Sequence, residues 1–171
     1  MKKFQFLLLD AGPIIKLFEL GKWDFFIEKC EVTISRIVAE EAKFAIKDEK
    51  KIFINLESYN DHIKIIDVDL SIIKSFHDMF TQTYKADIHD GEKETLAFLN
   101  QSSDNWQVCS ADGAVFKVLG LLGKSEQGIS LEEILNQIGL SQNLEKRFTK
   151  NFREHYTKIG QIDSIQDKGL K

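Results

Sequence analysis

The alternation of short apolar segments with amphipathic ones constrains the fold of this chain more than any other feature. Four segments have the length and composition of buried strands, and a stretch with helical spacing of apolar residues follows each of them. These strand-like segments are residues 4–9, 31–35, 62–68 and 106–110. Such alternation is typical of α/β proteins with a mostly parallel sheet between helices. We therefore expect a three-layer α/β/α fold with a mostly parallel central sheet.

Helices are expected between and after these strands, from the spacing of apolar residues and from capping signals such as Pro13 and Ser35. The expected helices span residues 13–20, 22–29, 36–47, 70–83, 90–100, 112–122, 130–138 and 143–156. The last dozen residues are polar and are expected to fray.

The composition supports a folded core and gives no membrane signal. Of the 171 residues, 43% are hydrophobic and 13 are Phe, so the chain can bury a core without disulfides or a structural metal. No apolar run approaches the roughly 18 residues that cross a bilayer. The start MKKFQFLLLD imitates a signal peptide, but Asp10 interrupts its apolar stretch and no small-residue cleavage site follows. We expect a cytoplasmic protein with no membrane partner.

The cysteines, the histidines and the net charge argue against several classes of function. Cys30 and Cys109 lie far apart in or beside apolar segments, which indicates buried free thiols. The four histidines are scattered without HxxxH spacing, so neither a zinc site nor a histidine-centred hydrolase is indicated. A formal charge of -4 argues against binding nucleic acid by bulk charge alone. Any RNA chemistry would therefore need local basic residues or bound cations.

Two acids are expected at the ends of strands. Asp10 closes the first apolar strand, and Asp112 follows the fourth. In parallel sheets, ligands bind at the carboxyl ends of the strands, so both positions favour a functional site. The structural alternatives are a turn-forming Asp before Gly12 and Pro13, and an N-cap at Asp112.

A third acid is expected on a buried helical stripe. Glu41 has apolar residues one turn before it and one turn after it, whereas Glu40 neighbours Arg36 and Lys43 on a solvated face. We therefore favour Glu41 over Glu40 as a site residue, although a shift of one residue in the helix would exchange them.

The fourth acid is Glu92, which lines up with Leu96 and Leu99, while Glu94 is expected on the far side of the same helix near Gln101. A carboxylate in a first turn also gains about 0.3–1 kcal/mol from the helix dipole. Capping is therefore the structural alternative for Glu92.

The four acids together indicate a shared site. If Asp10, Glu41, Glu92 and Asp112 converge, like charges about 5 Å apart repel by roughly 3 kcal/mol per pair at an effective dielectric of about 20. Such a cluster survives by binding protons or a cation. Oxygen ligands without Cys or His favour Mg²⁺ or Mn²⁺, and such ions typically handle phosphates.

The chain resembles the PIN-domain family in four segments that follow the family's order. They read LLLDAGPIIKL, ISRIVAEEA, HDGEKETLAFL and VCSADGAVFKVLGLLG, within about the first 125 residues. The resemblance thus divides the chain into a PIN-like domain at residues 1–125 and a helical extension at residues 126–171 packed on it. The extension does not match the family, and the residues after Asp112 lack the further acid that some members carry nearby, so occupancy by two metals is not implied.

The resemblance implies a Mg²⁺- or Mn²⁺-dependent endoribonuclease. Asp10, Glu41, Glu92 and Asp112 would be its catalytic metal-site acids, and Ser110 would be the hydroxyl two residues before the last acid. RNA would be the substrate, and the protein would resemble a toxin with an antitoxin partner. The alternatives are an inactive PIN-like interaction module and a metal-dependent phosphohydrolase that acts on a small phosphate ester.

Two further features bear on partners. Lys16, Lys43 and Lys93 are near the acids in sequence, and could position phosphates or be ordinary surface lysines. The expected helix at 143–156 has an apolar stripe with basic residues around it. The stripe consists of Leu144, Phe148, Phe152 and Tyr156. Packing on the chain's own domain, a homodimer and a partner protein are the alternatives for covering it.

Overall fold

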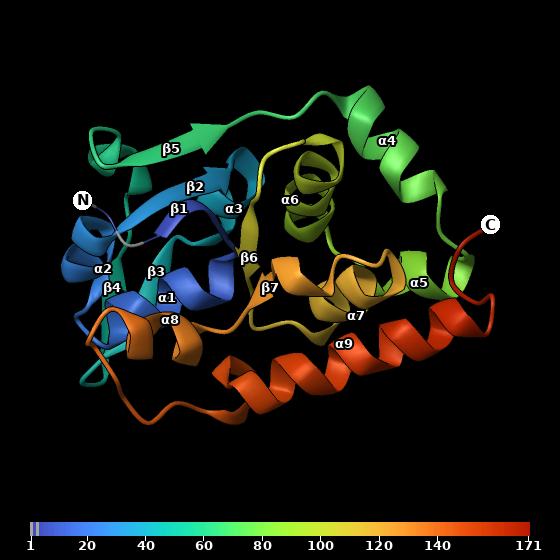
Figure 1. The fold of residues 1–171 in the computed structure, drawn as a ribbon. Helices are drawn as coiled ribbons and strands as arrows, with labels where there is room; N and C mark the ends of the chain where they lie inside the picture. Colours follow the sequence, from blue (N-terminus) through green and yellow to red (C-terminus); the bar gives the residue numbers. More distant parts are fainter. Residues whose placement is uncertain (1, 3) are drawn as a thin grey trace.

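A five-stranded parallel sheet forms the centre of the protein in a computed structural model that describes residue 2 and residues 4–171 (Figure 1). Its strands lie in the order β5-β2-β1-β6-β7, and all pairings between them are parallel. They are β1 (Phe4–Leu9), β2 (Cys30–Ser35), β5 (Ile63–Ile66), β6 (Gln107–Cys109) and β7 (Gly128–Ile129). The α/β class and the parallel central sheet are therefore confirmed.

Helices cover both faces of the sheet, because the central strand β1 is apolar on both sides. Leu7 and Leu9 point into one core cluster and Leu8 into the other, as successive residues of a strand must. The first cluster is closed by α1 (Ala11–Glu19), α2 (Trp23–Lys29) and α8 (Leu131–Gln137). The second is closed by α4 (Leu70–Asp78), α5 (Gln82–Asp87), α6 (Asp90–Gln101) and α7 (Gly113–Leu121).

The expected single helix over residues 36–47 is wrong. The helix α3 (Arg36–Glu41) ends after two turns, and an antiparallel hairpin follows, built from β3 (Phe44–Lys47) and β4 (Lys50–Phe53). Asp48 and Glu49 join the strands with φ values of 50° and 60°, the positive pair that a tight two-residue hairpin turn needs. The charged residues 48–51 are thus a turn and the start of a strand. The pairing of Phe44 with Phe53 is a cross-strand contact that helical periodicity does not reveal.

The helix expected over residues 70–83 is two helices, α4 and α5. They are separated at Phe80, where the backbone pairs with Leu170 near the end of the chain.

The last dozen residues do not fray as we expected. The final helix α9 (Lys150–Ile165) replaces the one expected at 143–156, and it begins at the N-cap Thr149 after a short 3₁₀ turn (Lys146–Phe148). Lys171 N then donates to the carbonyl of Met79.

Residues 126–171 are part of the central architecture and not an appendage to it. They supply β7, the edge strand beside β6, and α9, which lies along α7 (Figure 1). The apolar stripe expected on 143–156 is covered by the chain itself, because Phe148 is buried in the first core cluster and Phe152 packs against the second. Within the described residues, no helix is long and apolar enough to cross a membrane.

Two glycines allow the close approach of α7 and α9. A Cβ atom at Gly120 would collide with the backbone carbonyl oxygen of Thr157, and a Cβ atom at Gly160 would collide with that of Lys117. Backbone atoms cannot rotate away as a side chain can. The contact between the helices therefore depends on hydrogen at both positions.

We expect Gly160→Ala to lower the free energy of unfolding by about 1–3 kcal/mol, because the helices must move apart and lose packing. Urea unfolding of the purified protein measures this change. Ser164→Ala, at an exposed position of the same helix, is the control and should be neutral or slightly stabilising. Equal stability of the Gly160→Ala protein and the wild type would show that the helices separate without cost.

Candidate functional site

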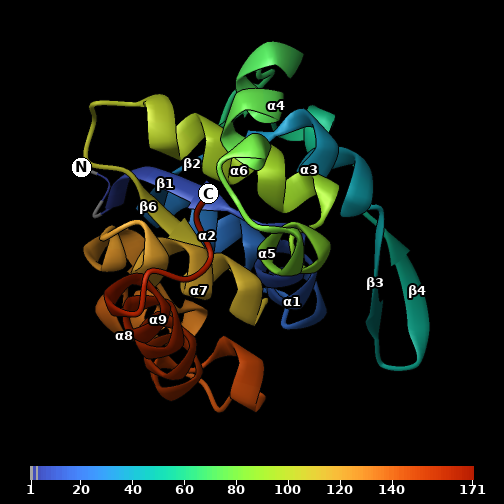
Figure 2. The same ribbon diagram turned by 90° about the vertical axis from the view of Figure 1, so that its right-hand side faces the viewer.

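The strand order reverses between β1 and β6. These strands are parallel neighbours, so their carboxyl ends lie side by side at the point of reversal. From β1 the chain proceeds outward to β2 and β5, and then returns to β6 and β7 on the other side. In open α/β sheets, the crevice at such a reversal, beyond the carboxyl ends of the strands, is where ligands bind. Figure 2 looks toward this edge of the sheet. Leu9 pairs with Cys109, so the residues that follow them lie next to each other.

Asp10 and Ser110 join the ends of the two strands. Ser110 Oγ donates to Asp10 Oδ2 at 2.7 Å, and the backbone N–H of Ala11 donates to Asp10 Oδ1 at 2.8 Å. Ser110 Oγ also accepts from the backbone N–H of Asp112 at 3.0 Å. Burial raises the pKa of Asp10 against the effect of these hydrogen bonds, and the charge of Asp112 raises it further.

Asp112 is both a helix cap and a member of the site. Its Oδ1 accepts from the backbone N–H of Ala114 at 2.8 Å, which caps α7 as the structural alternative expected. The same carboxylate lines a pocket of about 350 Å³ with Asp10 and Glu92. Capping therefore fixes the side chain in place and does not remove it from the pocket.

Glu92 lies in the first turn of α6 and is buried. Its Oε2 accepts from the backbone N–H of His89 at 2.9 Å, and His89 Nδ1 lies 3.6 Å from the same oxygen. Burial raises the pKa of Glu92 to about 8, and the charges of Asp112 and Asp10 act in the same direction. Glu92 and Asp112 each bring an oxygen to within 4.8 Å of each other and of a His89 ring nitrogen.

Glu41 reaches the pocket from the last residue of α3, whereas Glu40 is exposed and is not among the residues that line it. The expected burial of Glu41 on an apolar stripe is wrong. The helix ends at Glu41, so the Glu41 side chain is exposed at the rim of the pocket. Partial burial raises the pKa of Glu41, and the charge of Asp10 adds to this effect. A Cβ atom at Gly91 would lie 2.7 Å from Glu41 Oε2, so the glycine gives this carboxylate room.

The structure thus brings the four predicted acids to one pocket, and Ser110, which is buried and does not line it, donates a hydrogen bond to Asp10. They are Asp10, Glu41, Glu92 and Asp112. Carboxylates that gather where burial disfavours their charge are typical of cation sites. The assignment of these residues as metal ligands stays a prediction.

Sequence reasoning missed two residues of the pocket, His89 and Arg147. His89 is the first residue of the segment HDGEKETLAFL that carries Glu92, and its position three residues before this acid is a signal that could have indicated it. Arg147 comes from the 3₁₀ turn before α9, and no local pattern connects it with the acids. Its Cζ lies 4.8 Å from the centre of the Phe148 ring, so a fully buried side chain supports the guanidinium group.

Glu94 does not lie on the solvated side of α6 as we expected. It is buried, and its carboxylate accepts from the backbone N–H groups of Ile37 at 3.0 Å and Val68 at 3.4 Å. Glu94 therefore joins α6 to the first turn of α3 and to the segment after β5, and helps to set where Glu41 lies relative to Glu92.

The three lysines near the acids in sequence do not line the pocket. Lys16 pairs with Glu19 and Glu145, and Lys93 pairs with Asp90. Lys43 is exposed at the start of the hairpin.

The comparisons with known proteins give no relative: no family model matches this chain, and no curated protein or solved structure matches it significantly. The resemblance to the PIN-domain family therefore depends on the four sequence segments described above.

We expect the metal-free protein to lose stability as the pH rises from about 4.5 to 8, because folding raises the pKa of Glu92 across this window. The folded state holds a proton that the unfolded chain releases, so ionisation favours unfolding. Glu92→Gln removes this titration and should raise the free energy of unfolding at pH 8 by about 1–3 kcal/mol relative to its effect at pH 5.

Chemical unfolding in EDTA at several pH values measures this difference, and Glu40→Gln is the control, since Glu40 lies outside the pocket. A Glu92→Gln protein that is less stable by the same amount at every pH would identify Glu92 as a simple structural residue.

Proposed function

We propose that this protein is a PIN-type endoribonuclease that depends on Mg²⁺ or Mn²⁺, with the acidic pocket as its active site. One observation carries the proposal: carboxyl groups from four separate elements meet where the strand order reverses, in surroundings that raise the pKa values of Asp10, Glu41 and Glu92. The mutual repulsion of the charges in such a cluster destabilises the fold. A bound cation would offset this repulsion.

The donor set fits a hard divalent cation. Asp10, Glu92 and Asp112 offer carboxylate oxygens to one space, Glu41 adds another from the rim, and His89 offers a ring nitrogen. Glu92, whose pKa is about 8, holds a proton at neutral pH that a cation would displace. When bound, the cation would supply a more acidic water and neutralise charge on the phosphodiester oxygens.

The chain's own residues would orient the reacting groups. Ser110 donates to Asp10 and holds one of its oxygens in a fixed direction, while Ala114 N–H does the same for Asp112. Arg147 brings a planar cation to the same pocket, and a guanidinium group can donate two parallel hydrogen bonds to a phosphate. We assign Arg147 the role of holding the scissile phosphate against the acids.

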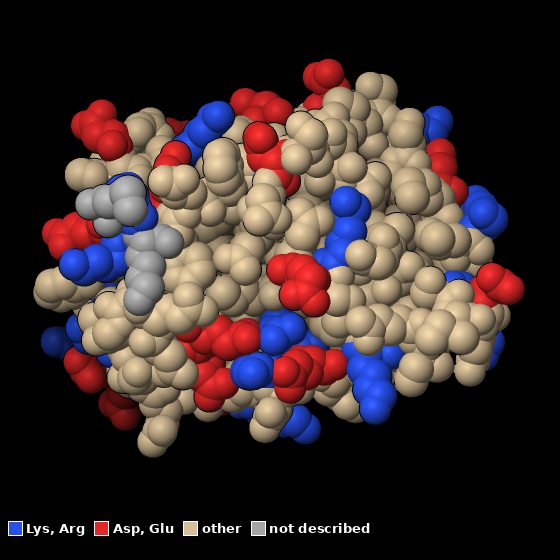
Figure 3. Space-filling model, in the orientation of Figure 1, with Lys and Arg blue, Asp and Glu red and all other residues tan. Residues whose placement is uncertain are grey.

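The distribution of charge favours local contacts with phosphate. On the face drawn in Figure 3, acidic and basic side chains of the described residues are interspersed and form no broad surface of one sign. Binding through a few placed residues such as Arg147 is consistent with the net charge of -4. We also propose action in the cytoplasm, where the free thiols of Cys30 and Cys109 would stay reduced. The roles of toxin and antitoxin partner stay predictions.

We expect Asp10→Asn and Asp112→Asn to lose at least about 100-fold in Mn²⁺-dependent RNA cleavage, since even the outer partners of metal ligands cost 10–100-fold. Mn²⁺ should raise the melting temperature of the wild type and not that of either variant, because the ion binds the folded state. Glu40→Gln is the matched control for a lost carboxylate and should keep both responses.

Cleavage of a small phosphate ester with RNA left intact would replace the proposal by the phosphohydrolase alternative. The absence of any response of the wild type to Mn²⁺ would contradict a metal site.

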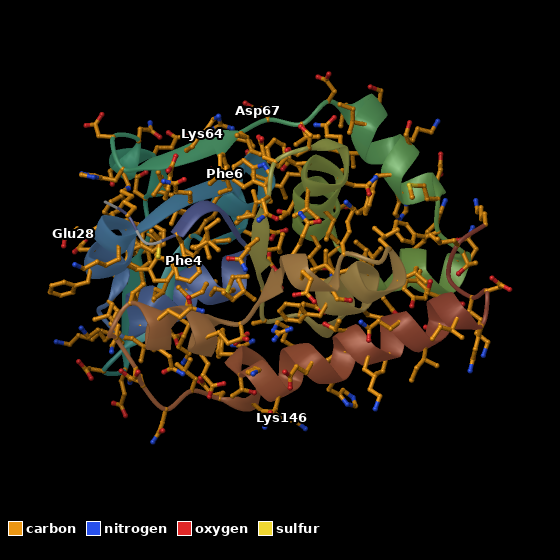
Figure 4. The ribbon with its side chains drawn as sticks, in the orientation of Figure 1. Phe4, Phe6, Glu28, Lys64, Asp67 and Lys146 are labelled. Atoms are coloured by element: carbon orange, nitrogen blue, oxygen red, sulfur yellow. The ribbon has the colours of Figure 1, made fainter. Side chains whose placement is uncertain are left out.

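We expect Arg147→Ala to weaken RNA cleavage by about 10–100-fold, the value of one or two charge-assisted hydrogen bonds, with an unchanged melting temperature. Arg147→Lys should recover part of the activity, since it keeps the charge and loses the planar fork. Lys146→Ala is the control: Lys146 is the neighbouring exposed cation, labelled at the lower edge of Figure 4. Equal losses in Arg147→Ala and Lys146→Ala would mean that Arg147 contributes only general charge.

A further inference from the structure

The β3–β4 hairpin presents an apolar face that its own chain leaves uncovered. It projects from the body beside α1 and α3 (Figure 2). Opposed residues of a hairpin share a face, so Phe44, Phe53, Ile46 and Lys51 lie on one side and Ala45 lies on the other. Ala45 is buried, and β3 contacts α1. The outer face therefore exposes Phe44 at 45%, Ile46 at 57% and Phe53 at 80% of their areas.

A cation lies in the middle of this outer face. Lys51 Nζ is 4.0 Å from the centre of the Phe44 ring and 5.4 Å from that of Phe53. The segment 43–53 contains four lysines and two acids, in a chain whose net charge is negative. Exposed rings beside ammonium groups are the combination that binds single-stranded nucleic acid, because bases stack on the rings and phosphates pair with the cations.

The hairpin also begins three residues after a residue that lines the acidic pocket. Glu41 lines the pocket, and Phe44 follows it by three residues, so their Cα atoms are at most about 11 Å apart. Lys43 N–H donates to the carbonyl of Glu41, and Ile54 N–H donates to the carbonyl of Lys43. These bonds tie both strands of the hairpin to the end of α3. A polymer that crosses the pocket can therefore reach the hairpin without a hinge between them.

We infer that the outer face of the β3–β4 hairpin binds single-stranded RNA, with bases stacked on Phe44 and Phe53 and a phosphate paired with Lys51. That this strand is the one cleaved rests on the proposed function. A second copy of the chain is the other occupant that an apolar face could take. The basic charge of the segment and its position beside a pocket suited to phosphodiesters favour RNA.

The test measures binding separately from cleavage. Fluorescence anisotropy in EDTA follows a labelled uridine-rich RNA strand with wild type, Phe53→Ala and Phe44→Ala. Each substitution should weaken binding about tenfold, as expected for the loss of one stacked base. Phe25→Ala is the control, since Phe25 is 58% exposed on α2 and lies outside the hairpin.

A second pair of variants tests the cation. Lys51→Gln should weaken binding and lower its salt dependence, whereas Lys50→Gln, one residue earlier on the inner face, should have a smaller effect. A duplex RNA should compete poorly, because its bases are already stacked. All substituted side chains are exposed or half-exposed, and circular dichroism checks that each variant is folded.

The outcomes separate this inference from the proposed function. Weaker binding by the hairpin variants supports the inference, even if the wild type fails to cleave RNA in Mn²⁺. Wild-type protein that does not bind the strand, or hairpin variants that bind like Phe25→Ala, would overturn it. A wild-type dimer that Phe53→Ala converts to a monomer, with RNA binding unchanged, would identify the face as a contact between copies and also overturn it.

Discussion

A buried hydrogen bond from Ser110 Oγ to Asp10 Oδ2 holds together the strand ends on which the candidate site depends. Ser110 Oγ also accepts from the backbone N–H of Asp112. One hydroxyl group therefore orients both the Asp10 carboxylate and the loop that carries Asp112. Ser110 is fully buried and Asp10 is 8% exposed, so bulk water cannot easily replace either contact. Glu41 and Glu92 line the pocket that forms beside these three residues.

A structural role at a helix terminus does not exclude these acids from the pocket. Asp112 caps α7 with one carboxylate oxygen, and Glu92 accepts from a backbone N–H at the start of α6. Each bond belongs to ordinary helix termini, and each also limits the directions in which the carboxylate can point. Helix capping is thus the means by which the fold places charged groups at a position where burial raises their pKa values.

Local patterns predicted the parallel sheet and the acids at its edge, because both depend on strands and helices that are visible within about ten residues. The preference for Glu41 over Glu40 led to the residue that lines the pocket, although the expected burial was wrong because α3 ends there. The hairpin and Arg147 were missed for a common reason. Each depends on contacts that periodicity does not report: cross-strand pairing for Phe44, and the path of the chain before α9 for Arg147.

The burial of Glu94 was missed for the same reason, because it depends on contacts between elements that periodicity does not report. Its spacing on α6 placed it away from Leu96 and Leu99, toward solvent, but α3 and the segment after β5 cover that side of the helix. A helix covered on two sides needs a polar group where it meets free backbone N–H groups, and amphipathic patterns treat such a residue as solvated.

The sheet order also has a consequence for how the chain assembles during synthesis. Asp10 is made before its hydrogen-bond partner Ser110, which follows it by 100 residues in the sequence. β1 occupies the middle of the sheet, so one side of it has no partner until β6 has been made. Such distant pairing slows folding. It also means that the like charges of the pocket are not all together until Asp112 has been made.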